Sequence, residues 1–140
     1  MKLNPVPLLK FAGISHLGLL AAGGLMPRVL GLRQHIESLP PIIQNLFWVY
    51  YSFIAFCLVS FGLLSFLLAP ALASGSALAR AVCGFLAAFW TIRLAAAWFV
   101  FDLNPYLTSF ARTAGYHTIN VVFLLLPVIY LYTAIAGGRR

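Results

Sequence analysis

Arg93 is the charged residue that stands deepest inside a long apolar run of this chain. It lies nine residues before Asp102, which puts it about 13 Å below the end of an α-helix at 1.5 Å per residue. A guanidinium at this depth in a bilayer costs at least about 2.5 to 3.5 kcal/mol unless it is solvated or paired. Asp102 falls on the opposite helix face, because nine residues at about 100° each end half a turn away. Arg93 is therefore the first candidate for binding an anion or a carbonyl oxygen.

Other polar groups lie at the same predicted depth as Arg93. His16 stands ten residues before the end of its apolar run, and Tyr50 and Tyr51 stand nine to ten residues after the start of theirs, which gives about 13 to 15 Å. Pro127 frees a backbone carbonyl at this depth in a fourth run. We expect these groups to form one polar layer in the middle of the membrane.

Two interpretations of this layer stay open. In the first, the groups only hydrogen-bond one another or a lipid headgroup and so satisfy a structural arginine. In the second, Arg93 with His16, Tyr50 and Tyr51 binds an anionic or carbonyl-bearing ligand such as a lipid headgroup or a quinone. The sequence indicates no bound cofactor beyond such an unknown lipid or quinone.

A second polar cluster is predicted at the outer boundary of the membrane. It comprises Asp102, His117, Asn120 and His35. Imidazole and carboxylate groups suit zinc or iron, but the spacing matches no compact metal signature, so we favour hydrogen bonds that close the loops and predict no metal. Haem held by His16 and His117 is disfavoured, because their predicted depths differ by about 13 Å.

The motifs of most membrane enzymes and transporters are missing. The chain has no C-x-x-C, no H-E-x-x-H, no glycine-rich phosphate loop and no acidic pair, and its two acids are Glu37 and Asp102. Cys57 and Cys83 stand alone and are expected to pack as small hydrophobes. An enzyme normally shows an acid and a base within reach of each other, so the sequence favours a non-enzymatic role.

The elements that must position these residues follow from the composition. Of 140 residues, 63% are hydrophobic and 8% are charged, against about 25% charged residues in soluble domains. A bilayer-spanning helix needs about 20 apolar residues, and the chain offers four such runs. They are residues 5–26, 41–69, 76–101 and 116–136. Six of the nine basic residues fall outside these runs and none builds a polar face, which excludes a nucleic-acid binder.

We therefore predict an all-α fold with one integral membrane domain over residues 1–140. Short links favour an antiparallel, up-down bundle of four transmembrane helices. Residues 27–40 and 102–115 are expected to carry short interfacial helices in the two outer loops. The first run is interpreted as a retained helix rather than a signal peptide, because it offers no clean cleavage site.

Small residues indicate how the helices pack. Gly84, Ala88, Thr91 and Ala95 follow a four-three-four spacing along one face of the third run. Such stripes let helix backbones approach closely in lipid. We expect the stripe to serve the bundle first, with association with other membrane subunits or self-association as the alternative.

Two segments resemble those of a group of small bacterial four-helix integral membrane proteins of uncharacterised function. They are LRQHIESLPPIIQNLFWVYYSFI at residues 32–54 and ALARAVCGFLAAFWTIRLAAAWFVFD at residues 77–102. The resemblance implies a bacterial inner-membrane protein with four spans, and it implies no catalytic residue.

Two classes of function remain. The favoured prediction is a small multi-pass membrane protein that is a non-enzymatic subunit or scaffold of a larger membrane assembly. The alternative is a membrane-embedded binding protein or enzyme for a lipid, quinone or other hydrophobic ligand held at the His/Tyr/Arg layer. Small size and missing catalytic groups support the first, and the depth of Arg93 supports the second.

The distribution of positive charge predicts the orientation. The side with both termini and the second link carries Lys2, Lys10, Arg80, Arg139 and Arg140. The opposite side carries Arg28, Arg33 and Arg112. Because cytoplasmic segments hold the excess of Lys and Arg, both termini are expected in the cytoplasm.

Reporter fusions test this topology. A reporter fused after Arg140 should be active on the cytoplasmic side, and the same reporter inserted within residues 34–38 should be active on the opposite side, because an odd number of spans separates the two positions. Finding both reporters on one side would contradict the predicted arrangement of spans.

Overall fold

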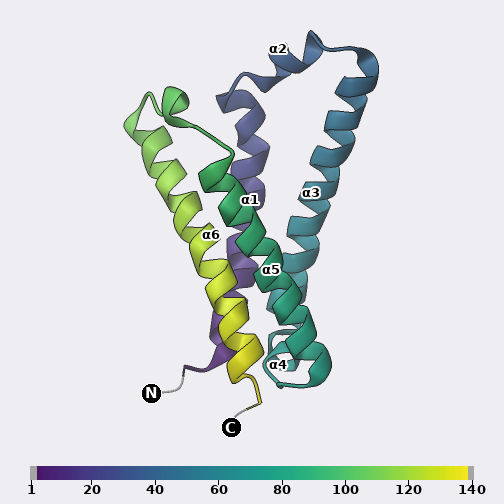
Figure 1. Cartoon of the computed structure of the whole chain (residues 1–140), viewed down its shortest axis with the longest axis vertical. Coiled ribbons are helices and arrows are strands. Elements are labelled where there is room, and N and C mark those ends of the chain that lie inside the picture. Colours follow the sequence, from purple (N-terminus) through teal and green to yellow (C-terminus); the bar gives the residue numbers. More distant parts are fainter. Residues whose placement is uncertain (1–2, 139–140) are drawn as a thin grey trace.

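The fold consists of four long helices joined by short helical turns (Figure 1). The computed structural model describes residues 3–138, apart from the side chain of Asn104. Within these residues there is no strand. The long helices are α1 (Pro5–Val29), α3 (Pro41–Leu67), α5 (Ala77–Phe99) and α6 (Phe110–Ala136). The short ones are α2 (Leu32–Glu37), α4 (Ala69–Leu72) and the 3-10 turn η1 (Asn104–Tyr106).

All four long helices are long and apolar enough to cross a membrane. The chain is therefore a multi-pass membrane protein, and the predicted all-α four-helix architecture is confirmed. Large apolar side chains face outward along the helices, as a bilayer requires: Phe99 and Phe110, for example, are exposed.

Local capping explains where the helices begin. The side chain of Asn4 accepts a hydrogen bond from the backbone N–H of Val6 at 3.0 Å, and Pro5 follows at the first helical position. Ser109 accepts from the N–H of Arg112 at 3.4 Å. This cap starts α6 six residues before the predicted apolar run at 116, so the last helix extends beyond its apolar part.

The helices form two antiparallel hairpins, α1 with α3 and α5 with α6 (Figure 1). α1 also packs against α6, and this contact joins the hairpins. One end of the bundle, the terminal end, holds Leu3, Gly138 and α4, and there the Tyr132 hydroxyl donates to the carbonyl of Leu3 at 2.9 Å. The opposite end, the loop end, holds α2 and η1. Lys2, Arg139 and Arg140, which entered the predicted orientation, lie outside the described residues.

α3 leans away from α5 toward the loop end (Figure 1). Nearer the terminal end the two helices meet through Phe61, whose ring centroid lies 6.2 Å from that of Phe85 and 5.1 Å from that of Phe89. The first half of α3 is left largely exposed. Most of its side chains there face the surroundings, whereas Tyr51 contacts α1.

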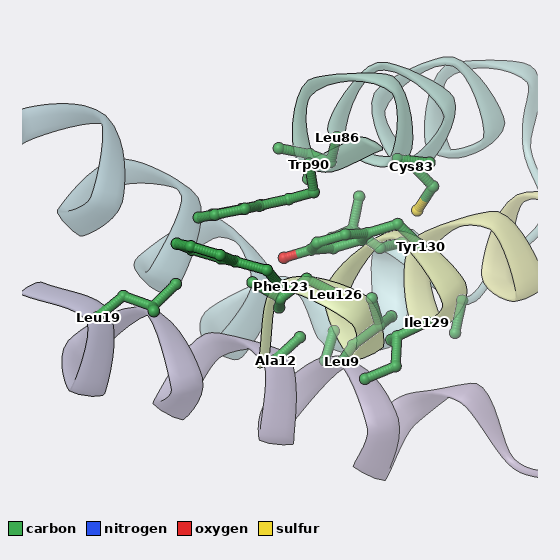
Figure 2. Close-up of a cluster of buried hydrophobic side chains, with 14 residues drawn as sticks. Leu9, Ala12, Leu19, Cys83, Leu86, Trp90, Phe123, Leu126, Ile129 and Tyr130 are labelled. Carbon is green, nitrogen blue, oxygen red and sulfur yellow. The ribbon is translucent and has the colours of Figure 1, made fainter. Parts of the chain in front are cut away.

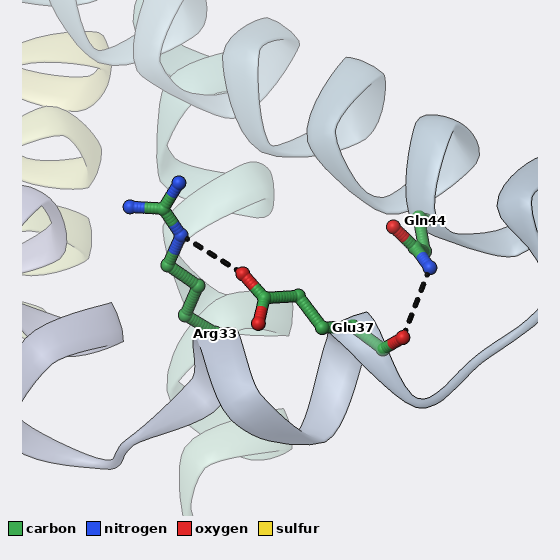
Figure 3. A network of polar contacts seen from close by, with 3 residues as sticks. All are labelled: Arg33, Glu37 and Gln44. Atoms are coloured by element: carbon green, nitrogen blue, oxygen red, sulfur yellow. Dashed lines mark hydrogen bonds and ion pairs between the residues drawn. The ribbon is translucent and has the colours of Figure 1, made fainter.

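Polar contacts fasten α2 to the start of α3 (Figure 3). Arg33 donates to the Glu37 carboxylate at 3.2 Å on the surface of α2. The Gln44 amide of α3 donates to the carbonyl oxygens of Glu37 at 3.2 Å and Leu39 at 2.8 Å. The exposed ion pair contributes little stability, roughly 0 to 1 kcal/mol. The two backbone contacts of Gln44 set the direction in which the chain turns back into the membrane.

The core lies between α1, α5 and α6 (Figure 2). Its largest members are Trp90, Phe123 and Tyr130, packed with leucines of α1 and α5. Cys83 is buried in this core, as expected of a small hydrophobe, whereas Cys57 is half-buried.

The α1–α3 hairpin depends on a close approach at Gly13. A Cβ at Gly13 would lie 2.8 Å from the Cβ of Phe66 and 2.9 Å from the carbonyl oxygen of Gly62. Because no side chain fits at these distances, glycine lets the two backbones cross. Small residues at crossings are the usual device for helix association in lipid.

Gly13→Ala should destabilise the protein by about 1 to 3 kcal/mol, because the added methyl forces the two backbones apart. Gly18→Ala is the matched control on the same helix, where an added Cβ meets nothing within 4 Å. It should be neutral or slightly stabilising, since alanine favours a helix by about 1 kcal/mol over glycine. Thermal unfolding in mild detergent measures both. Equal effects of the two variants would contradict the close α1–α3 crossing.

Candidate functional site

His16 is the point at which all four long helices meet. It belongs to α1 and is fully buried. Its ring centroid lies 6.3 Å from that of Phe61 on α3, 5.1 Å from Trp90 on α5 and 6.4 Å from Tyr130 on α6. Each of these aromatic rings meets the imidazole at a steep angle. One polar side chain thus contacts one ring from every other spanning helix.

The hydrogen bonding of His16 defines its tautomer. Its Nδ1 lies 2.6 Å from the carbonyl oxygen of Ala12, one turn earlier. Because a carbonyl oxygen only accepts, Nδ1 carries the hydrogen, and Nε2 of the neutral ring is an acceptor. Nε2 is buried without a hydrogen-bond partner, and so is Nε1 of the neighbouring Trp90. The two neighbouring rings, with centroids 5.1 Å apart, thus carry one buried acceptor and one buried donor.

A pair of hydroxyl groups completes the buried polar centre. Ser65 of α3 and Tyr130 of α6 lie 2.5 Å apart, oxygen to oxygen. Both side chains are fully buried, and the pair links α3 directly to α6. Ser65 and Trp90 did not enter the sequence prediction. Trp90 is detectable in principle, because it stands one turn before Arg93 on the same face of its helix.

Arg93 is held by aromatic rings rather than by an ion pair. Its guanidinium carbon lies 4.7 Å from the ring centroid of Phe123 and 5.8 Å from that of Phe101. One terminal nitrogen, Nη1, is buried without a hydrogen-bond partner. Phe123 also stacks on Trp90, with centroids 5.7 Å apart and planes 28° apart. Arg93 and His16 are thus connected through two rings, with no hydrogen bond between them.

The two tyrosines of the predicted layer lie elsewhere. Tyr50 is 62% exposed, on the part of α3 that leans away from the bundle. Tyr51 is half-buried and donates to the carbonyl oxygen of Gly23 on α1. The structure therefore brings His16 and Arg93 into one aromatic column, but it does not bring Tyr50 or Tyr51 to them.

The predicted cluster at the boundary lies at the loop end as separate contacts. Nδ1 of His35 lies 3.0 Å from the carbonyl oxygen of Gly31 in its own segment. The ring of His117 packs on Tyr116, and the amide of Asn120 donates to the Tyr116 carbonyl at 2.9 Å. Asp102 is exposed. Within residues 3–138 no three His, Cys, Asp or Glu side chains gather where they could hold a metal ion.

Two hollows lie beside the aromatic column that connects His16 with Arg93. A pocket of about 380 Å³ at the loop end is lined by residues 97–103 and Tyr116. A groove of about 600 Å³ lies between α5 and α6. It is lined by Gly84, Ala87, Ala88, Thr91, Ile92, Leu124, Pro127, Val128 and Leu131.

The groove shows where the stripe of small residues points. Gly84, Ala88 and Thr91 line it, and a Cβ at Gly84 would meet nothing within 4 Å. Gly84 is half-buried and Ala88 and Thr91 are exposed, so whether the stripe serves the bundle or a partner stays a prediction. Ala95 is not among the lining residues. The crossing at Gly13 and the aromatic core hold the four helices together.

Comparison of the chain with protein-family models, curated proteins and solved structures found no match. The resemblance of residues 32–54 and 77–102 to small bacterial membrane proteins stays a prediction. The function must accordingly be argued from the geometry of the chain itself.

His16→Ala should destabilise the protein by about 2 to 5 kcal/mol, because it leaves a cavity where all four helices meet. His35→Ala is the matched control, since His35 is exposed and bonds only within its own segment. It should change the stability by less than about 0.5 kcal/mol. The midpoint of thermal unfolding in detergent reports both effects. An unchanged midpoint for His16→Ala would contradict the central role of this side chain.

Proposed function

We propose that this protein is a non-enzymatic subunit of a larger membrane assembly and binds one apolar transmembrane helix of its partner in the groove between α5 and α6. The observation that carries the proposal is that Gly84, Ala88 and Thr91 line an open groove between α5 and α6, where a Cβ at Gly84 would meet nothing within 4 Å. Small residues on an exposed face in lipid let a second backbone approach closely.

The chemistry of the groove suits an apolar helix. Thr91 is the polar side chain of its lining, and its hydroxyl already donates to the carbonyl of Ala87 at 2.8 Å. The groove therefore presents no side-chain donor that a lipid headgroup or a polar ligand would need. From Gly84 to Ile92 it follows about 12 Å of α5, or two helical turns, at 1.5 Å per residue. This length matches the contact that two packed helices make.

The acids of the chain support a non-enzymatic role. Glu37 pairs with Arg33 on the exposed surface of α2, and Asp102 lies at the loop end. Neither stands beside His16 in the aromatic column. General acid–base catalysis normally uses titratable groups within hydrogen-bond reach of the reacting atoms, and a carboxylate beside His16 would be such a group.

The location belongs to the same proposal. We place the protein in a bacterial inner membrane, with its terminal end in the cytoplasm. The excess of Lys and Arg on the terminal side of the sequence supports this orientation. The resemblance to small bacterial membrane proteins supports the compartment.

Site-specific photocrosslinking tests the groove. A photoreactive residue at Thr91 should form an adduct with an apolar transmembrane segment of another protein, and Gly84→Leu should reduce that adduct by about tenfold, because the leucine fills the groove. Gly18→Leu is the control, since Gly18 is an exposed glycine of α1 with open space around its Cβ. It should leave the adduct unchanged.

The identity of the adduct decides between the occupants. A crosslinked peptide from a second copy of this chain would show that the chain associates with itself. That result would contradict a larger assembly with a different protein. Adducts with lipid alone would overturn the proposed function. An adduct that persists in Gly84→Leu would show that the partner lies outside the groove.

A further inference from the structure

We infer that Arg93 and Asn120 form a binding site for a phospholipid headgroup whose phosphate is accompanied by a hydrogen-bond donor. Arg93 lies on α5 and Asn120 on α6, both in the half of the hairpin toward the loop end. We expect the bilayer to change from hydrocarbon to headgroups at that end. The inference is independent of the proposed helix partner, which binds in the groove nearer the terminal end.

The first argument is an unpaired cation at the right depth. Arg93 stands six residues before the end of α5 at Phe99, about 9 Å below it at 1.5 Å per residue. Its guanidinium extends toward the C-terminal end of α5, because it lies over the ring of Phe101 as well as that of Phe123. Nη1 remains a buried donor with no acceptor. A guanidinium in this setting calls for an anionic oxygen, and phosphate matches its geometry.

The second argument is an acceptor without a donor. The amide nitrogen of Asn120 bonds the carbonyl of Tyr116, so its Oδ1 is left to accept, and this atom is buried without a partner. Asn120 stands immediately before the apolar residues 121–129 of α6, at the edge of the hydrocarbon region. Its Oδ1 complements a hydroxyl or ammonium group on the ligand.

The third argument is the pocket at the loop end, of about 380 Å³. Ala97, one turn beyond Arg93, and Phe101, which contacts the guanidinium, both line it. Tyr116, one turn before Asn120, lines it from α6. The pocket is thus lined by the turn of α5 that follows Arg93 and by a residue of the turn of α6 that precedes Asn120. Asp102 also lines it.

These groups define the ligand class. Phosphatidylethanolamine and phosphatidylglycerol carry a phosphate together with an ammonium or hydroxyl donor. Phosphatidylcholine carries the same phosphate but no donor, so it is the natural negative control. A free headgroup shares this chemistry, and the lipid is favoured because Arg93 lies below the membrane surface.

Native mass spectrometry of the delipidated protein in detergent measures the affinities. Wild type should bind phosphatidylethanolamine and phosphatidylglycerol about tenfold more tightly than phosphatidylcholine, the equivalent of one charge-assisted hydrogen bond. Arg93→Gln should lose about tenfold in affinity for both lipids. Arg112→Gln is the control, because it removes an exposed arginine at the same end that bonds Thr108 and the Tyr106 carbonyl. It should bind like wild type.

Asn120→Ala provides a second measurement that does not depend on the folding of the arginine variant. It removes the acceptor and should abolish most of the preference over phosphatidylcholine. Equal binding of all three lipids by wild type, or unchanged lipid preference in both variants, would overturn the inference. If soluble glycerophosphoethanolamine displaces the lipid, the natural ligand is a free headgroup rather than a membrane lipid. Loss of the Thr91 adduct bears on the groove alone, so the two proposals fail separately.

Discussion

The structure depends on burying one neutral imidazole where four helices meet. Lipid supplies no hydrophobic force between helices, so their association relies on close packing and on polar contacts inside the bundle. His16 combines both, because its Nδ1–H is satisfied by Ala12 and its ring edges contact aromatics of α3, α5 and α6. Gly62 leaves room for this side chain, since a Cβ at Gly62 would lie 3.1 Å from that of His16 and would require a small shift. The Ser65–Tyr130 pair then fixes α3 against α6 at the same centre.

The α5–α6 hairpin carries both proposed sites on different stretches of its length. The groove at Gly84 and Thr91 is apolar and opens to the hydrocarbon. The column from Trp90 through Phe123 to Arg93 leads instead to the polar pocket at the loop end. The same two helices therefore present an apolar face to a neighbour and a cation to the headgroup region, without a residue shared between the two sites.

The sequence predicts the spans well and the site only in part. Length and hydropathy locate four helices, since both are properties of a single segment. Counting residues also predicts similar depths for His16 and Arg93, which the structure connects through two rings. Counting residues does not give the direction in which a side chain points. The sequence therefore groups Tyr50 and Tyr51 with His16 and Arg93, although α3 leans away from them. For the same reason the sequence left two roles open for the stripe at Gly84, because a stripe of small residues looks alike on an inner and an outer face. Ser65 was missed because its partner, Tyr130, lies 65 positions later and is related to it only by the fold.

The division into two consecutive hairpins has a consequence for biosynthesis. Most contacts join neighbours along the chain, so each hairpin is complete once its second helix has left the ribosome. α1 and α3 can enter the membrane as a pair while α5 is still being translated. The docking of α6 on α1 closes the bundle, and it waits for the last helix to be made. Until then, His16 and Ser65 lack Tyr130, the side chain of α6 that both contact in the complete bundle.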